Sequence, residues 1–291
     1  MTRVGAPVLS VIMPVHNGEK TVMRAVKSTL KAMPSNSELL IQLDGCSDNS
    51  KKILESINDK RLSVFSSVEN IGVSATLNSL LRRASGMYIA RMDADDVCLR
   101  SRFKKQLQAM RSLNSDLLFG KAILWNPKSF IPLLPTPTPR LSRRELDLAL
   151  IRSNPFVHPT LMATKSCLDS LGGYTDSAAE DYDLWLRARA DGYQIDRINS
   201  YVLFYRVHES QLTKKPVWQQ KLNNDQVLVD SLRRFAEKVL GIDSDAHRTL
   251  TETSDALWNN VVAKFKPPVI LRWKLLGVKA TLRSLRKKSS L

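Results

Sequence analysis

Apolar residues near the start of the chain alternate between short continuous runs and sets spaced three and four apart. Residues 8–13 form an almost unbroken apolar run that stops at Pro14, and residues 19–33 follow with helical spacing. This pattern predicts a strand, a loop and a helix. It recurs as predicted strands over 39–43, 62–66 and 87–92 and predicted helices over 48–57 and 73–84. Such alternation predicts an α/β fold with a mostly parallel central sheet flanked by helices.

The pattern changes in the second half of the chain. Prolines recur between residues 127 and 139 and predict an extended surface connector, with a flap over an acceptor site as the alternative. Helical spacing returns over 142–151 and 182–190, and from residue 218 onward the chain is helical in pattern. We therefore predict one domain over residues 1–215 and a helical C-terminal extension over residues 216–291.

Polar residues follow three of the predicted strands directly. His16 and Asn17 follow the first strand, Asp44 follows the second, and residues 93–96 follow the strand that ends at Met92. In open α/β sheets, ligands bind beyond the carboxyl ends of the strands. We therefore expect these residues to line one crevice, although they are far apart along the chain.

Three carboxylates lie within four positions, at Asp93, Asp95 and Asp96. Like charges this close raise one another's pKa, so the group stays ionised near neutral pH only if a cation or strong donors compensate. Hard oxygen ligands suit Mg²⁺ or Mn²⁺. The alternative interpretation is a solvated acidic loop without a metal.

Composition indicates a soluble globular protein, with 43% hydrophobic and 25% charged residues. The formal net charge of +16 favours an anionic partner, such as a sugar nucleotide, a nucleic acid or an acidic membrane face. Three cysteines in no ligand-like spacing predict neither a disulfide framework nor a zinc site, and they favour the cytoplasm. No segment approaches the roughly 18 apolar residues that a membrane-spanning helix needs.

The C-terminal segment is strongly basic. After Asp255 the chain has nine Lys or Arg residues and no acidic ones, and leucines and a valine repeat at helical spacing between 271 and 285. This predicts a basic amphipathic helix over residues 268–288. Such a helix suits an anionic membrane surface, and packing on the protein's own body is the alternative.

Taken in order, the motifs resemble those of the inverting glycosyltransferases of family 2, which have the GT-A (Rossmann-like) fold. The matching segments are residues 9–19, 43–50, 70–78, 90–96, 158–160, 180–187 and 205–208. His16 stands where the family more often has Tyr, and Leu43 replaces the first Asp of an Asp-Asp-Gly turn. The match extends over residues 8–212.

The resemblance implies a nucleotide site and a metal site. The residues that would border the nucleotide are Pro14, His16, Asn17, Glu19, Asp44, Asn70, Gly72, Arg91 and Asp93. Asp44 would accept a hydrogen bond from the base, which favours a UDP- or dTDP-linked donor; a turn-forming Asp is the alternative. The metal ligands would be Asp93, Asp95 and His208, and Asp96 would cap a helix or support the ligands.

The implied reaction is displacement at the anomeric carbon of the donor sugar by an acceptor hydroxyl, with inversion. Asp181, beside Glu180, is the predicted base; the alternative is that Glu180, Asp181 and Asp183 only offset the dipole of the helix that begins there. A single sugar would be transferred to a saccharide or lipid-linked acceptor in the synthesis of a cell-surface polysaccharide or glycoconjugate. We expect a cytoplasmic enzyme, with peripheral attachment to the inner face of the cell membrane as a further possibility.

Two other functional classes fit parts of the sequence. The charge of +16 is compatible with a nucleic-acid-binding protein, but no nucleic-acid motif is present and no such partner is expected. A nucleotidyltransferase also uses paired carboxylates with a metal. It would need a glycine-rich phosphate loop near the N-terminus, and residues 15–20 form a poor one.

Overall fold

The computed structural model describes residues 5–126, 134–135, 141–207, 216–242 and 249–265. His208, the basic segment 268–288 and most of the proline-rich connector lie outside the described residues. The chain forms two compact units. Unit 1 comprises Met1–Pro135, Val157–Tyr174 and Asp196–Arg206, and unit 2 comprises Thr136–Phe156, Thr175–Ile195 and Val207–Leu291. The boundary between residues 215 and 216 stays a prediction.

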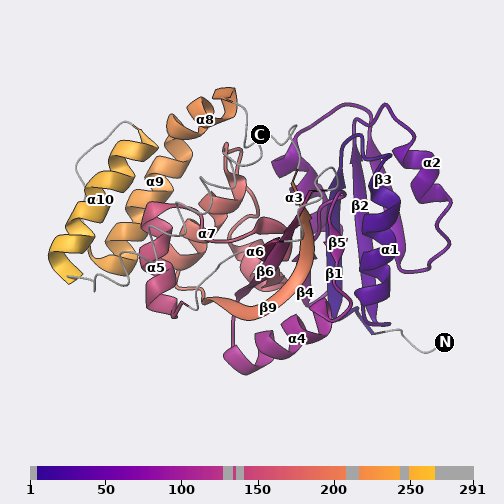
Figure 1. Ribbon diagram of the computed structural model, residues 1–291, viewed down its shortest axis with the longest axis horizontal. Coiled ribbons are helices and arrows are strands. Elements are labelled where there is room, and N and C mark those ends of the chain that lie inside the picture. Colours follow the sequence, from indigo (N-terminus) through magenta and orange to yellow (C-terminus); the bar gives the residue numbers. More distant parts are fainter. Residues whose placement is uncertain (1–4, 127–133, 136–140, 208–215, 243–248, 266–291) are drawn as a thin grey trace. The chain divides into compact units, whose positions relative to one another are not determined.

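Unit 1 begins with a parallel sheet in the order β3-β2-β1-β4. The strands are β1 (Leu9–Val15), β2 (Ser37–Asp44), β3 (Leu62–Ser67) and β4 (Tyr88–Arg91). The connecting helices are α1 (Val22–Ala32), α2 (Ser50–Glu55) and α3 (Val73–Arg83). These elements confirm the strands and helices predicted from the hydrophobic pattern, and Figure 1 shows them together in indigo and violet.

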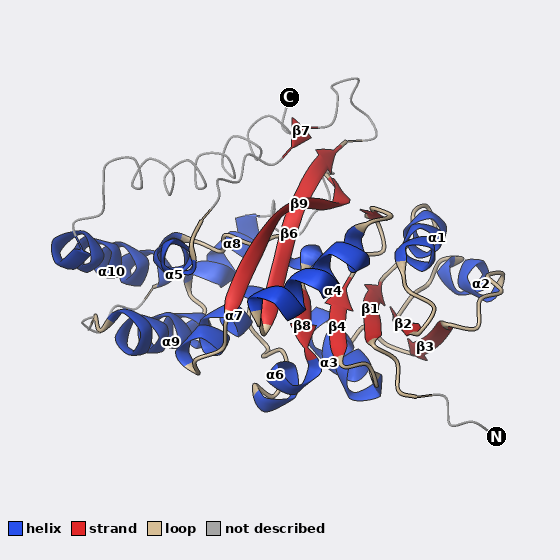
Figure 2. Cartoon of the chain, turned by 90° about the horizontal axis from the view of Figure 1, so that it is seen from below, coloured by secondary structure: helices blue, strands red, loops and turns tan. Residues whose placement is uncertain are grey.

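Beyond β4 the sheet becomes antiparallel, which makes it mixed. The added strands are β8 (Met162–Thr164), β6 (Leu117–Trp125), β9 (Ile195–Arg206), β5 (Val97–Cys98) and β7 (Leu134–Pro135). Figure 2 shows β6 and β9 as long neighbouring strands. Unit 1 also contains α4 (Arg102–Leu113), a 3₁₀ turn η1 (His158–Thr160) and α6 (Lys165–Ser170).

Strand β1 lies at the centre of the core of unit 1. Its residues Leu9, Val11 and Met13 are fully buried, as expected for a strand with neighbours on both sides. The parallel strands are therefore held by packing on both faces. Their carboxyl ends, where the candidate site residues follow, lie at one edge of the sheet.

Unit 2 is helical. Its elements are α5 (Arg143–Arg152), α7 (Glu180–Ala190), α8 (Pro216–Asn223), α9 (Gln226–Phe235), a π-helical turn η3 (Ala236–Leu240) and α10 (Leu250–Phe265). Helix α9 packs on α7 and α10, and α10 also packs on α5 (Figure 1). Trp185 of α7 is fully buried. In the part of the chain that the structure describes, no helix combines the length and apolarity needed to cross a bilayer.

The contact between β6 and β9 gives a test of the antiparallel half of the sheet. A Cβ atom on Gly120 of β6 would lie 2.5 Å from a methyl group of Val202 on β9. We expect Gly120→Ala to destabilise the protein by about 1–3 kcal/mol through overpacking. Urea unfolding measures this, and adding Val202→Ala should recover part of the loss. A single variant as stable as the wild type would contradict the packing of these strands.

Candidate functional site

The loops after β1 and β2 are joined by reciprocal hydrogen bonds. The backbone N–H of Ser47 donates to Asn17 Oδ1 over 2.9 Å, and that of Glu19 donates to Asp48 Oδ2 over 2.8 Å. In return, the N–H of Asn49 donates to Glu19 Oε2 over 3.2 Å. Each loop therefore satisfies polar groups of the other, and the two form one wall at the edge of the sheet.

Asp44 is buried at the end of β2 and holds a third loop. Its Oδ1 accepts the N–H of Ile71 over 2.7 Å and lies 3.2 Å from the Ser67 hydroxyl, while Oδ2 accepts the N–H of Gly72 over 3.2 Å. A Cβ atom on Gly45 would lie 2.5 Å from the backbone nitrogen of Asn70, so the two loops touch through glycine. Asp44 thus orders the loop that enters α3.

His16 lies at the meeting point of these three loops. Its Nδ1 is 2.6 Å from the carbonyl oxygen of Asp44, and its Nε2 is 3.3 Å from the side-chain amide nitrogen of Asn17. The side-chain nitrogen of Asn70 lies 3.2 Å from the same Nδ1, and this contact is not a hydrogen bond when Nδ1 is protonated. Because a carbonyl can only accept, Nδ1 carries the proton and Nε2 accepts from Asn17. The structure therefore brings together His16, Asn17 and Asp44, which follow predicted strands, and Asn70 joins them.

The acidic cluster follows β4. Carboxylate oxygens of Asp93, Asp95 and Asp96 all lie within 4.8 Å of one another. Arg91 pairs with Asp93 over 2.6 Å, and Arg206 of β9 lies 3.9 Å from Asp95. Two guanidinium groups thus offset part of the cluster's negative charge.

Asp96 is the innermost member of the cluster. It is fully buried, and its Oδ1 accepts the backbone N–H of Arg206 over 2.8 Å. Its Oδ2 has no hydrogen-bond partner among the described residues. Asp96 therefore anchors the end of β9 beside the cluster, which is the supporting role that was one of the two expectations for it.

Burial is the main influence on the ionisation of these carboxyl groups. It raises the pKa of Asp96 well above its ordinary value, and the charges of Asp93 and Asp95 raise it further. Burial also raises the pKa of Asp93, although the Arg91 guanidinium opposes that shift. A divalent cation would relieve this repulsion, and converging carboxylate oxygens are the ligands that Mg²⁺ and Mn²⁺ prefer. The donor set therefore fits such an ion.

His158 is a structural residue. It is buried, and its Nε2 lies 2.9 Å from the Tyr174 hydroxyl. Burial lowers the pKa of His158 well below its ordinary value, and the charge of Arg91 lowers it further. The ring is therefore neutral, and it packs in the interior of unit 1 near Arg91.

In unit 2, the acidic residues at the start of α7 have different surroundings. Asp183 is fully buried and accepts hydrogen bonds from Thr175, Arg187 and Ser231 over 2.5–2.7 Å. The bond from Ser231 joins Asp183 of α7 to α9. Asp181 is partly exposed and accepts the side-chain N–H of Asn154 over 2.8 Å. Asp181 and Glu180 are therefore the members of this group that are not enclosed in the helical core.

Two features of these surroundings were not predicted. The sequence analysis assigned no role to Asn154, although an Asn directly before Pro155 is a recognisable signal for a fixed turn. It also did not predict β9, which carries Arg206 to the acidic cluster. His208, two residues further on, lies outside the described residues, so its assignment as a ligand stays a prediction.

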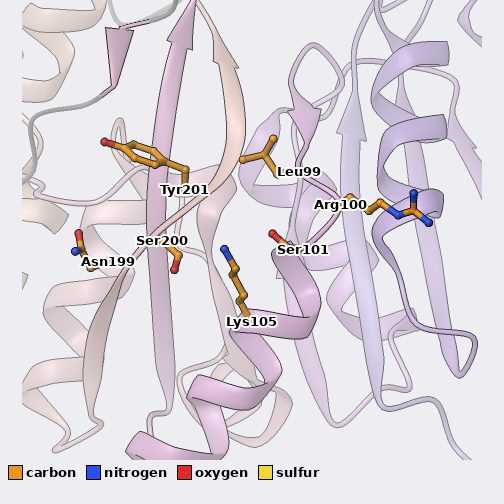
Figure 3. Close-up of a pocket in the computed structure, with 7 residues that line it drawn as sticks. All are labelled: Leu99, Arg100, Ser101, Lys105, Asn199, Ser200 and Tyr201. Carbon is orange, nitrogen blue, oxygen red and sulfur yellow. The ribbon is translucent and has the colours of Figure 1, made fainter.

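Unit 1 also has a shallow hollow of about 570 Å³ that contains none of the predicted site residues. It is lined by Leu99, Arg100, Ser101, Lys105, Asn199, Ser200 and Tyr201. Figure 3 shows Lys105 rising from α4 toward the β9 residues, while Arg100 extends away from the others. None of its lining residues belongs to the acidic cluster.

Solved structures show which fold this is. S. aureus TarS 1–349, in complex with UDP-GlcNAc, matches with a TM-score of 0.64 at 18% identity, over 93% of this chain and 79% of TarS. The mannosyltransferase PcManGT from Pyrobaculum calidifontis, in complex with GDP-Man and Mn²⁺, matches with a TM-score of 0.57 at 17% identity, over 98% and 77% of the two chains. The fold is GT-A, as predicted.

Sequence relatives show the family. The family model described as Glycosyl transferase family 2 matches residues 10–169. The O-antigen biosynthesis glycosyltransferase WbnJ of Escherichia coli is 33% identical over 215 residues, which cover 71% of this chain and 82% of WbnJ. The E. coli UDP-Glc:alpha-D-GlcNAc-diphosphoundecaprenol beta-1,3-glucosyltransferase WfgD is 27% identical over 208 residues, which cover 70% and 79%. The chain belongs to glycosyltransferase family 2 and is an enzyme of that class.

The raised pKa values of the acidic cluster predict a pH dependence of stability. Carboxyl groups with a raised pKa bind more protons in the folded than in the unfolded protein. In EDTA-treated protein, stability should therefore fall as the pH rises above about 4, through the raised pKa range. Asp96→Asn keeps an acceptor for the N–H of Arg206 but removes the charge, so it should flatten this dependence.

Thermal unfolding between pH 5 and pH 8 measures the effect. Asp230→Asn, at an exposed position on α9, is the charge-matched control and should behave like the wild type. If Asp96→Asn and the wild type lose stability in parallel as the pH rises, the buried carboxyl is not the cause.

Proposed function

We propose that the protein transfers a single sugar from a UDP- or dTDP-linked donor to an acceptor hydroxyl, with inversion at the anomeric carbon and with a divalent metal ion. The observation that supports this most strongly is the convergence in unit 1 of the nucleotide loops after β1 and β2 with the carboxylates after β4. TarS and PcManGT, which share the fold, have structures with UDP-GlcNAc and with GDP-Man and Mn²⁺.

The nucleotide would lie against the wall formed by Pro14, His16, Asn17, Glu19 and the Asn70–Gly72 loop. Among the described residues, Asp44 Oδ2 accepts only the 3.2 Å bond from Gly72, so it retains a lone pair. That lone pair suits the N–H of uracil or thymine. The exposed ring of His16, held by Asp44 and Asn17, would border the base where the family more often has Tyr.

The metal site would be formed by Asp93 and Asp95, with His208 as a further ligand. When bound, the ion would neutralise the charge that develops on the departing nucleoside diphosphate. Arg91 pairs with Asp93 and Arg206 lies near Asp95, and both supply further positive charge. Asp96 would keep Arg206 in place through the backbone of β9.

The acceptor would be deprotonated by Asp181, with Glu180 beside it. A base that removes the hydroxyl proton while the acceptor oxygen attacks the anomeric carbon forms one bond as the bond to the diphosphate breaks, which inverts the centre. Asp181 is partly exposed and hydrogen-bonded, whereas Asp183 is enclosed and paired with Arg187. This contrast supports Asp181 as the base.

The acceptor would be a saccharide or a lipid-linked saccharide in the synthesis of a cell-surface polysaccharide. WbnJ is named for O-antigen biosynthesis, and the name of WfgD includes a diphosphoundecaprenol acceptor. An acceptor of that kind resides at a membrane. The basic segment 268–288 would then hold the enzyme peripherally on an anionic cytoplasmic membrane face.

Chelation tests the metal. With UDP-glucose, UDP-GlcNAc and dTDP-glucose as donors, water as the acceptor and Mn²⁺ present, we expect hydrolysis of at least one donor to the free sugar and its nucleoside diphosphate, and EDTA should abolish this hydrolysis. Excess Mn²⁺ or Mg²⁺ should restore it. Full turnover in EDTA would remove the metal from the proposal while leaving the family unchanged.

Substitution of the base tests the reaction. Asp181→Asn should lower turnover by about 10²-fold or more, because the general base contributes about 10²–10⁴ to such reactions. Binding of UDP with Mn²⁺, measured by calorimetry, should stay near the wild-type value. Wild-type turnover in this variant would reject Asp181 as the base.

A further inference from the structure

The side-chain amide of Asn154 both donates and accepts a hydrogen bond near the start of α7. Its side-chain nitrogen donates to Asp181 Oδ2 over 2.8 Å, and its Oδ1 accepts the backbone N–H of Phe156 over 3.1 Å. The second bond closes a local turn and fixes which end of the amide faces Asp181. The orientation of the amide is therefore set by the backbone and not by the carboxylate alone.

The turn itself is rigid. Asn154 precedes Pro155, which restricts its backbone to extended conformations, and both Pro155 and Phe156 are buried. Asp181 is restrained from the other side, because its Oδ1 accepts the N–H of Tyr182 over 2.7 Å. The Tyr182 hydroxyl in turn donates to the carbonyl of Leu150 on α5. The carboxylate thus lies between a fixed turn and a fixed helix start.

We propose that Asn154 is a positioning residue for the reaction: it holds the Asp181 carboxylate in its ionised form and in one rotamer, with Oδ1 and Oδ2 each receiving one donor. This inference depends on the proposed function of Asp181 as the base. A donated hydrogen bond favours the charged form of a carboxylate, so Asn154 keeps the base deprotonated at lower pH than it would otherwise be. It also restricts the carboxylate to a geometry for attack.

Other charged groups lie on the surrounding elements of unit 2. They are Glu180, Asp183 and Arg187 on α7, Arg152 at the end of α5 and Asp225 at the start of α9. Asp183 pairs with Arg187, Arg152 with Asp255, and Asp225 accepts from Ser177 and Ala178. None of these pairs involves Asn154, so a substitution there leaves them in place.

Two substitutions separate positioning from a purely structural role. Asn154→Asp retains an oxygen for the N–H of Phe156, so the turn persists, but it replaces the donor to Asp181 with a second carboxylate. Asn154→Ala removes both bonds. Asn223→Ala is the matched control, since Asn223 also makes two hydrogen bonds within unit 2, to the backbone and hydroxyl of Thr251.

The first measurement follows the side-chain carboxyl carbon of Asp181 by ¹³C NMR as the pH changes, with the resonance assigned from Asp181→Asn. We expect the titration midpoint to move to higher pH in Asn154→Ala and to split into two coupled steps in Asn154→Asp. Asn223→Ala should titrate like the wild type. This readout requires no substrate, and an unchanged Asp181 titration in both Asn154 variants would overturn the inference.

The second measurement is the hydrolysis of the donor that turns over in the chelation test, with water as the acceptor and Mn²⁺ present. At pH 8, Asn154→Asp should lower kcat by about 10- to 100-fold, as expected for a displaced catalytic group. It should recover in part toward pH 6, where one shared proton restores a donor to Asp181, whereas the wild type falls over that range. UDP affinity should be unchanged.

The two variants separate the role of Asp181 as the base from the role of Asn154 as its positioning residue. If Asp181→Asn retains wild-type turnover, the assignment of the base fails. If Asp181→Asn is inactive but Asn154→Asp has the kcat and pH profile of the wild type, the assignment of Asp181 as the base is retained and the positioning role of Asn154 is wrong.

Discussion

The structure depends on balancing the negative charge at the end of β4. Asp93, Asp95 and Asp96 lie within 4.8 Å of one another, and burial makes ionisation of the inner two unfavourable. Unit 1 offsets this with Arg91 from β4 itself and Arg206 from β9. The backbone N–H of Arg206 donates to the Asp96 carboxylate, so the antiparallel strand β9 ends beside the acidic residues that follow the parallel strand β4. The mixed sheet thus brings the two arginines that offset the negative charge to the acidic cluster.

The side of the site that we propose for the nucleotide is built in a different way. There the polar groups of three loops satisfy one another, with Asp44 and His16 at the centre. These hydrogen bonds fix the backbone of the three loops at the sheet edge. They leave the outer faces of the side chains accessible to a ligand. The same residues therefore serve the fold and the proposed recognition of the base. This explains why Asp44, which resembles an ordinary turn residue in sequence, is buried.

Sequence patterns predicted the first half of the fold well and the second half less completely. Parallel strands buried on both faces are nearly continuous apolar runs, so β1, β2 and β4 were recognisable. Strand β9 alternates polar and partly buried residues, and β6 contains Gly120 and Lys121, so neither has that signal. In the site, the family resemblance identified Asp181 as the predicted base, but spacing did not show that Asp183 is enclosed and Asp181 partly exposed. That distinction arises from tertiary partners, Ser231 and Asn154, which lie 48 and 27 positions away.

The central claim is that the carboxylates after β4 hold a metal ion against a nucleotide whose base meets Asp44. A crystal structure of the protein with UDP and Mn²⁺ tests it most directly. We predict anomalous density for Mn²⁺ at Asp95, the diphosphate on the ion, and the uracil ring against Asp44 and His16. Mn²⁺ bound elsewhere, or UDP bound away from the ends of β1, β2 and β4, would contradict the account.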